Sequence, residues 1–251
     1  MKAIFCAHRL ASSPARAMVA AVWTSALLAL GGCASKPVTP DWLLNAQGAA
    51  ERAVTAYLEG KARVAQAEAT RLRGEVARTG DLALLARTEL LQCAAHVASL
   101  DFAPCSGFDA VQQDASAAGR AYARYLTGVF APADVALLPS AQQAPASALQ
   151  ATDARRGEGG ADGVGVVKAV ADPLSRLVAA GVWFRAGQGS PALMDLAADT
   201  ASEQGWSRPL LAWLEVHARH AEATGDRATA ERAHRRIDLV LSGRAVPKLV
   251  R

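Results

Sequence analysis

The sequence predicts an all-α fold in which antiparallel helical hairpins stack into an α-α array. The composition supports this prediction, because alanine is abundant while aromatic residues make up only 5% of the chain. Such a composition favours helices over strands. The spacing of apolar residues supports it independently. From Trp42 onwards they recur three and four positions apart, as they do along one face of a helix.

An N-terminal helical region is expected at residues 41–139. Asp41 can cap its first helix, and Gly60 ends that helix. Thr79-Gly80-Asp81 closes the second helix with glycine and opens the third with an aspartate cap. The expected ranges are 42–59, 62–78, 82–100 and 110–127, with a weaker helix from Pro132 that includes Val135, Leu137 and Leu138.

The helical pattern is lost at residues 140–163, which are rich in Ala, Gln, Ser and Gly. The run from Arg155 to Gly160 is incompatible with a regular element. The whole segment is therefore expected to be a flexible linker or insertion. The alternative is that its Ala-rich first half forms a solvent-exposed helix.

A C-terminal helical region is expected at residues 164–243, before a mildly basic tail at 244–251 that is interpreted as frayed. Asp172-Pro173 either kinks the first helix of this region or marks its true start. Ser190-Pro191 is a cap followed by proline at the first helical position. The expected helices are 166–186, one from Ser190, one from Ser207, and one from Asp226 to about Leu241.

The tripeptide Thr-Gly-Asp joins two helical patterns twice, at 79–81 and at 224–226. Each segment resembles the turn of a tetratricopeptide-type helical hairpin. Gly225, Asp226 and Ala230 fit that consensus, whereas its aromatic positions hold Ala221 and His234. No period of repeats is visible along the chain. The resemblance implies a tetratricopeptide-like packing of hairpins.

The first 33 residues resemble the signal peptide of a bacterial lipoprotein precursor. Lys2, Arg9 and Arg16 give a basic start, and 17–30 is an uncharged apolar run that is too short to span a bilayer, which takes about 20 residues. Leu30-Gly31-Gly32-Cys33 then matches the lipobox pattern. The alternatives are an ordinary secretory signal cleaved near Ala34, or a membrane anchor.

The lipoprotein resemblance implies a subcellular location for the protein. Residues 1–32 would be removed, Cys33 would carry lipid, and 33–40 would be a tether. Ala34, rather than aspartate, follows the cysteine, which in the enterobacterial pattern implies transport to the outer membrane. We therefore expect a protein that is lipid-anchored at the outer membrane, on its periplasmic face, and that carries palmitate-type acyl chains.

The net charge of +4 does not point to nucleic acid. Three of the 27 Lys and Arg residues lie in the segment expected to be removed, which has no Asp or Glu, so 24 basic and 23 acidic side chains remain. No basic stripe interleaved with aromatic residues is present, and we expect no nucleic-acid partner.

Cys93 and Cys105 are expected to form a disulfide, because the inferred compartment permits one. The helix carrying Cys93 ends near Leu100, and Asp101-Phe102-Ala103-Pro104 turns the chain back within reach. The alternative is a pair of buried free thiols.

No catalytic motif is found, and no catalytic, cofactor or metal residue is predicted. His217 and His234 lie at similar distances from the Gly225-Asp226 turn, each on the apolar stripe of its helix. They are therefore expected to meet inside the last hairpin. With Glu231 they could bind a metal, but the favoured interpretation is a packed, hydrogen-bonded pair.

Four aromatic residues gather in the second half of the chain, and they either line a groove for a partner's helix or peptide or belong to the core. They are Trp183, Phe184, Trp206 and Trp213. The expected function is a non-enzymatic helical adapter or assembly factor with a protein partner in the envelope. The alternatives are a periplasmic cell-wall hydrolase and a small-ligand-binding lipoprotein.

Overall fold

The computed structural model describes residues 39–154 and 163–244. The predicted signal peptide, the lipidation site Cys33, the tether up to residue 38, and the tail after 244 lie outside the described residues. Residues from Pro40 onwards form one compact unit. None of the described helices combines the length and the apolar character that a membrane crossing requires.

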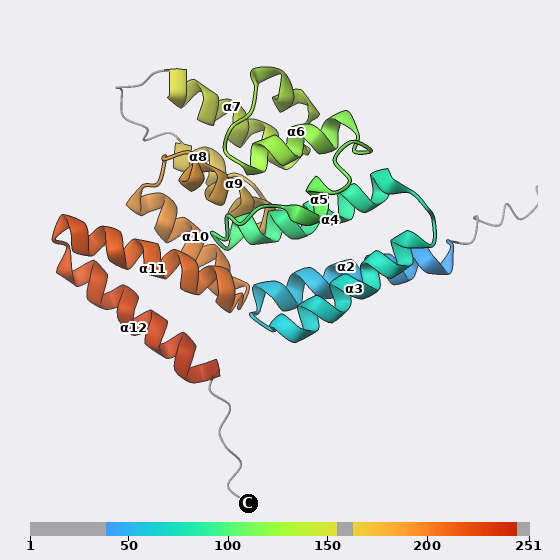
Figure 1. Cartoon of the computed structure of the whole chain (residues 1–251). Coiled ribbons are helices and arrows are strands. Elements are labelled where there is room, and N and C mark those ends of the chain that lie inside the picture. The colour runs from blue at the N-terminus through green and yellow to red at the C-terminus, as the bar shows by residue number, and fades with distance from the viewer. Residues whose placement is uncertain (1–38, 155–162, 245–251) are drawn as a thin grey trace, which may run out of the picture. The chain divides into compact units, whose positions relative to one another are not determined.

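The all-α prediction is confirmed, since the described residues form helices and no strand. Consecutive helices pack as hairpins, most closely α2 with α3, α10 with α11 and α11 with α12 (Figure 1). The elements are α2 (Asp41–Leu58), α3 (Ala62–Ala77), α4 (Leu82–Ala98), α5 (Ser106–Asp109), α6 (Ala117–Leu126), the 3₁₀ helix η1 (Pro132–Leu137), α7 (Ser140–Ala154), α8 (Gly163–Lys168), α9 (Pro173–Arg185), α10 (Pro191–Glu203), α11 (Ser207–Thr224) and α12 (Arg227–Arg244).

Several helix starts follow the capping residues in the sequence. Asp81 accepts a hydrogen bond from the Leu84 amide at 2.9 Å, and Ser190 accepts one from the Leu193 amide at 3.2 Å. Asp172 caps α9, so Asp172-Pro173 marks a true helix start. Asp41 differs from the prediction, because it is the first helical residue rather than the cap.

Two predicted helices are shorter than expected. The expected helix at 110–127 begins only at Ala117, because the Ser116 side chain accepts a hydrogen bond from the Gly119 amide at 3.0 Å and starts α6 there. The expected helix at 166–186 is divided into α8 and α9 by the Asp172 cap. The weak helix from Pro132 is a 3₁₀ helix.

The prediction of a flexible linker is wrong for residues 140–154, which form α7. This helix is not solvent-exposed either, because Gln142, Ala146 and Leu149 are buried in it. Residues 155–162 lie outside the described part of the chain. Residues 163–168 form α8.

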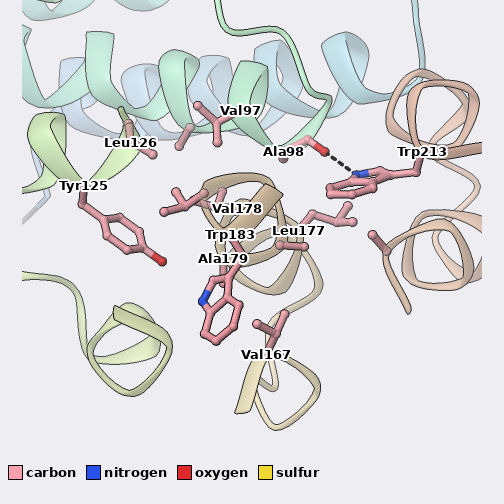
Figure 2. Close-up of a cluster of buried hydrophobic side chains, with 14 of the residues drawn as sticks. Val97, Ala98, Tyr125, Leu126, Val167, Leu177, Val178, Ala179, Trp183 and Trp213 are labelled. Atoms are coloured by element: carbon pink, nitrogen blue, oxygen red, sulfur yellow. Dashed lines mark hydrogen bonds between the residues drawn. The ribbon is translucent and has the colours of Figure 1, made fainter. Parts of the chain in front are cut away.

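One core joins the two predicted helical regions. Its buried side chains come from α4, α6 and α7 in the first half of the chain and from α8 to α12 in the second half. Figure 2 shows Tyr125, Trp183 and Trp213 arranged around Leu177 and Val178 of α9. A separate, smaller cluster, formed by Ala46, Ala49, Leu72 and Val76, holds α2 against α3.

Candidate functional site

The candidate site is a groove of about 600 Å³ lined by α10, α11 and α12. These three helices follow one another in the chain and pack as successive hairpins. The groove is predominantly polar. Its polar and charged lining residues are Asp195, Asp199, His217, His220, Thr224, Asp226, Thr229, Arg232 and Arg236.

His217 is the buried polar residue of this groove, with 6% of its surface exposed. It lies on the face of α11 that also carries the buried residues Trp213 and Leu214. Its Nδ1 atom lies 3.2 Å from Oδ1 of Asp195, which projects from α10. Since Asp195 is exposed, this contact joins the floor of the groove to its rim.

Asp226 forms the end of the groove, at the turn between α11 and α12. Gly225 adopts a left-handed conformation with φ of 79°, and Asp226 then accepts a hydrogen bond from the Thr229 amide at 3.1 Å. Hydrogen bonds from Thr229 hold the pKa of Asp226 below its ordinary value, and the positive charge of Arg232 lowers it further. The carboxylate at this end is therefore kept ionised.

Two arginines of α12 complete the groove. Arg236 forms an ion pair with Asp199 of α10 at 3.2 Å, and Arg232 donates a hydrogen bond to the Thr229 hydroxyl at 3.3 Å. The groove thus presents carboxylates, guanidinium groups and hydroxyls along three helices. Such a lining can hydrogen-bond a polar peptide segment.

The prediction that His217 and His234 meet inside the last hairpin is wrong. His234 is exposed, and its Nε2 atom lies 2.8 Å from Glu222. That contact raises the pKa of His234 above its ordinary value. The inward positions of α12 are Ala230 and Ala233, as the apolar stripe predicts, but position 234 does not belong to that inward face. No metal-binding group of three His, Cys, Asp or Glu residues occurs in the described ranges.

The aromatic residues do not form the predicted partner groove. Trp183 and Trp213 are buried, and their indole nitrogens donate hydrogen bonds to the carbonyls of Pro145 and Ala98, each at 3.1 Å. Phe184 packs edge-on against Trp213. Phe184 and Trp206 are half-buried against the same core. The core interpretation left open by the sequence therefore holds for the two buried tryptophans.

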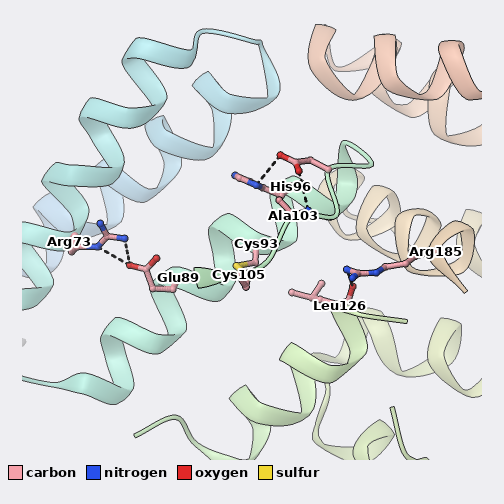
Figure 3. Close-up of a disulfide and its surroundings, with 9 residues drawn as sticks. Arg73, Glu89, Cys93, His96, Ala103, Cys105, Leu126 and Arg185 are labelled. Carbon is pink, nitrogen blue, oxygen red and sulfur yellow. Dashed lines mark hydrogen bonds and ion pairs between the residues drawn. A yellow bond between two sulfur atoms is a disulfide. The ribbon is translucent and has the colours of Figure 1, made fainter. Parts of the chain in front are cut away.

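The predicted disulfide between Cys93 and Cys105 is present, with the two Cα atoms 5.9 Å apart (Figure 3). It borders a second hollow, of about 920 Å³, lined by α4, the loop after it, α5, α6 and Arg185. Glu89 is buried at this hollow and accepts hydrogen bonds from Arg73 at 2.6 and 2.9 Å. Arg185 donates to the Leu126 carbonyl at 3.2 Å and lies over the Phe102 ring.

A cluster beside the disulfide loop was not foreseen from the sequence. Asp101 lies 3.2 Å from Nδ1 of His96 and accepts a hydrogen bond from the Tyr57 hydroxyl at 3.3 Å. The Tyr57 and His96 rings stack with centroids 4.5 Å apart, and Arg208 lies over Tyr57. Burial lowers the pKa of His96 and raises the pKa of Tyr57 to about 12.

Through Tyr57, His96 and Arg208, this cluster brings α2, α4 and α11 into contact at one point. Leu100, inside the loop, has a φ of 56°, a conformation that is strained for a leucine. His96 and Asp101 are five positions apart, but Tyr57 and Arg208 come from distant parts of the chain, and no spacing rule connects them to this pair. A local sequence signal for it was therefore lacking.

Comparisons with known proteins add no family. The chain matches no protein-family model, and no curated protein or solved structure is significantly similar to it.

Proposed function

We propose that this protein is a lipid-anchored helical adapter at the outer membrane, facing the periplasm, which binds a segment of a protein partner rather than catalysing a reaction. The observation that carries the proposal is the polar groove along α10, α11 and α12. The lipobox-like Leu30-Gly31-Gly32-Cys33 supports the proposed lipid anchoring at the outer membrane.

The architecture of the groove supports a binding role. Its walls are helices that pack against one another and share the main core, so they present a preformed surface. A preformed surface loses little conformational entropy when a partner binds. Its polar lining favours a hydrogen-bonded segment over an apolar helix, which would need an apolar groove.

Site-directed photocrosslinking in cells tests the adapter role. A benzophenone amino acid in place of Arg232, an exposed residue of the groove, is expected to give a discrete protein adduct. The matched control places it at Gln66, an exposed residue of α3. An adduct pattern that is the same at both positions, or none from position 232, would argue against partner binding in the groove.

The lipid anchor is tested separately by the mass of the processed protein. We expect residues 1–32 to be absent and the new N-terminal Cys33 to carry acyl chains, with the protein in the membrane fraction. Cys33→Ala should block this processing. An unacylated wild-type mature protein would contradict the anchor but leave the groove untouched.

A further inference from the structure

The hollow beside the Cys93–Cys105 disulfide differs in character from the polar groove of α10, α11 and α12. Its volume of about 920 Å³ is in the range of pockets that hold small organic ligands. Apolar side chains form a large part of its walls, namely Leu85, Val97, Phe102, Phe108, Val111 and Leu126. Apolar walls around a few polar groups are typical of a binding site for a small molecule.

Glu89 supplies an unsatisfied hydrogen-bond acceptor to this hollow. The residue is only 6% exposed, and both hydrogen bonds from Arg73 go to the same oxygen, Oε1. Figure 3 shows the other oxygen pointing away from Arg73, and no donor in the described part of the chain is bonded to it. Gly107 makes room for this oxygen, since a Cβ atom there would overlap it. Because a buried acceptor without a donor costs free energy, an N–H group of a ligand would be favourable here.

Two charged side chains of opposite sign line the hollow without an ion pair among the described residues. Asp109 is exposed and lies in α5, two residues after Gly107, while Arg185 is exposed at the end of α9. The other charged residues of the lining are in the ion pairs Arg73–Glu89, His96–Asp101 and Arg124–Asp134. Figure 3 shows Glu89 and Arg185 on opposite sides of the disulfide. The hollow therefore has an acidic end and a basic end.

We propose that this hollow binds a short peptide that has free termini and apolar side chains, with its ammonium group at Glu89 and Asp109 and its carboxylate at Arg185. A guanidinium group matches the geometry of a carboxylate, and carboxylate oxygens accept hydrogen bonds from an ammonium group. Since the two ends lie on opposite sides of the disulfide, the ligand is longer than one amino acid. Three extended residues span about 10 Å, and their side chains would contact the apolar walls.

This site is independent of the adapter role proposed for the groove and of the proposed lipid anchor. The hollow and the groove have no lining residue in common. A failure of crosslinking at position 232, or an unacylated Cys33, would therefore leave the peptide site untouched, and the reverse also holds.

Isothermal titration calorimetry on the purified protein tests the proposal with three forms of one peptide. The probes are alanyl-phenylalanyl-alanine with free termini, the same peptide acetylated at its amine, and the same peptide amidated at its carboxylate. We expect the free peptide to bind, and each blocked form to bind about tenfold more weakly or less well still, because each lacks one charge-assisted contact.

Variants assign each end of the peptide to its residue. Arg185→Gln should abolish the preference for the free carboxylate over the amide and keep the preference for the free amine. Asp109→Asn should reduce the preference for the free amine alone. A purely structural effect would instead weaken binding of all three peptides alike. The matched control is Arg87→Gln, an exposed position on α4 that does not line the hollow and should keep both preferences. Circular dichroism verifies that each variant is folded.

Three results would overturn the proposal. The first is no binding of the free peptide at millimolar concentration, and the second is equal affinity of the wild-type protein for the free and the blocked peptides. The third is an Arg185→Gln variant that still prefers the free carboxylate as strongly as the wild type does.

Discussion

At the scale of single residues, Gln142 explains why an apparently polar segment is buried. Its side-chain oxygen accepts a hydrogen bond from the Tyr125 hydroxyl at 2.8 Å, and its nitrogen donates to the Ser175 carbonyl at 2.9 Å. An amide whose two ends are both bonded can be buried at little cost. This one residue ties α7 to α6 and α9.

The three tyrosines of the chain provide a prediction at this scale. Burial raises the pKa of Tyr57 to about 12 and raises the pKa values of Tyr122 and Tyr125 further. The folded state therefore favours the protonated phenol. The contribution of this preference to the free energy of unfolding is complete below the unfolded pKa of 10 and is lost as the pH rises towards the folded pKa values. We therefore expect no tyrosinate absorbance in the folded protein near pH 10.

A spectrophotometric titration measures this directly. In denaturant all three tyrosines should titrate around their ordinary pKa of 10, whereas in the folded protein absorbance should rise only at higher pH, with alkaline unfolding. Tyr57→Phe serves as a control, because the two remaining tyrosines, Tyr122 and Tyr125, should not ionise near pH 10 in the folded protein. A tyrosine that titrates near pH 10 in the folded protein would contradict the burial described here.

At the scale of elements, the contact between α4 and α9 depends on a glycine. A Cβ atom at Gly181 would lie 2.3 Å from the carbonyl oxygen of Val97. The Trp213 indole also donates to the Ala98 carbonyl, at the end of α4 (Figure 2). The two contacts place α9 and α11 against the same end of α4.

Gly181→Ala is expected to destabilise the protein by about 2–4 kcal/mol, because the obstacle is backbone and cannot rotate away. Gly74→Ala in α3 is the matched control. Nothing lies within 4 Å of a Cβ at that position, and alanine in a helix interior should stabilise by about 0.5–1 kcal/mol. Urea unfolding gives both values. Equal effects would show that the close approach of α9 to α4 is not as described.

At the scale of the whole molecule, the α2–α3 hairpin is the least integrated part. It packs on its own small apolar cluster, and the main core does not include that cluster. Polar contacts provide much of its attachment, including Arg208 and Ser207 donating to the carbonyls of Tyr57 and Glu59, and the Arg73–Glu89 ion pair.

Hydrogen exchange should therefore be faster in α2 and α3 than in α9, because local unfolding requires less free energy where few apolar contacts are broken. Mass spectrometry of peptides from one exchanged sample compares the exchange rates of α2 and α3 with that of α9, so that α9 is the internal reference. Glu89→Gln should increase exchange in α3 and leave α9 unchanged. Uniform protection across all three helices would indicate that the hairpin unfolds only with the rest of the molecule.

Local signals in the sequence predicted much of this fold. The caps Asp81, Ser190 and Asp226 are short-range hydrogen bonds, and the helical apolar stripes are set by residues a few positions apart, so both can be read directly from the chain. The disulfide was also predictable, because its cysteines are 12 positions apart. The lipobox-like segment stays a prediction.

Contacts between distant residues decided the rest. His234 faces outward, because the inward side of α12 consists of Ala230 and Ala233 and does not extend to position 234. Residues 140–154 became a packed helix through partners on α6 and α9, and Tyr57, His96 and Asp101 met across 44 positions of sequence. Composition determined that this chain is helical. Only the packing of the helices decided which polar side chains were enclosed and which were left facing the groove or the solvent, because burial depends on the neighbours that the tertiary structure supplies.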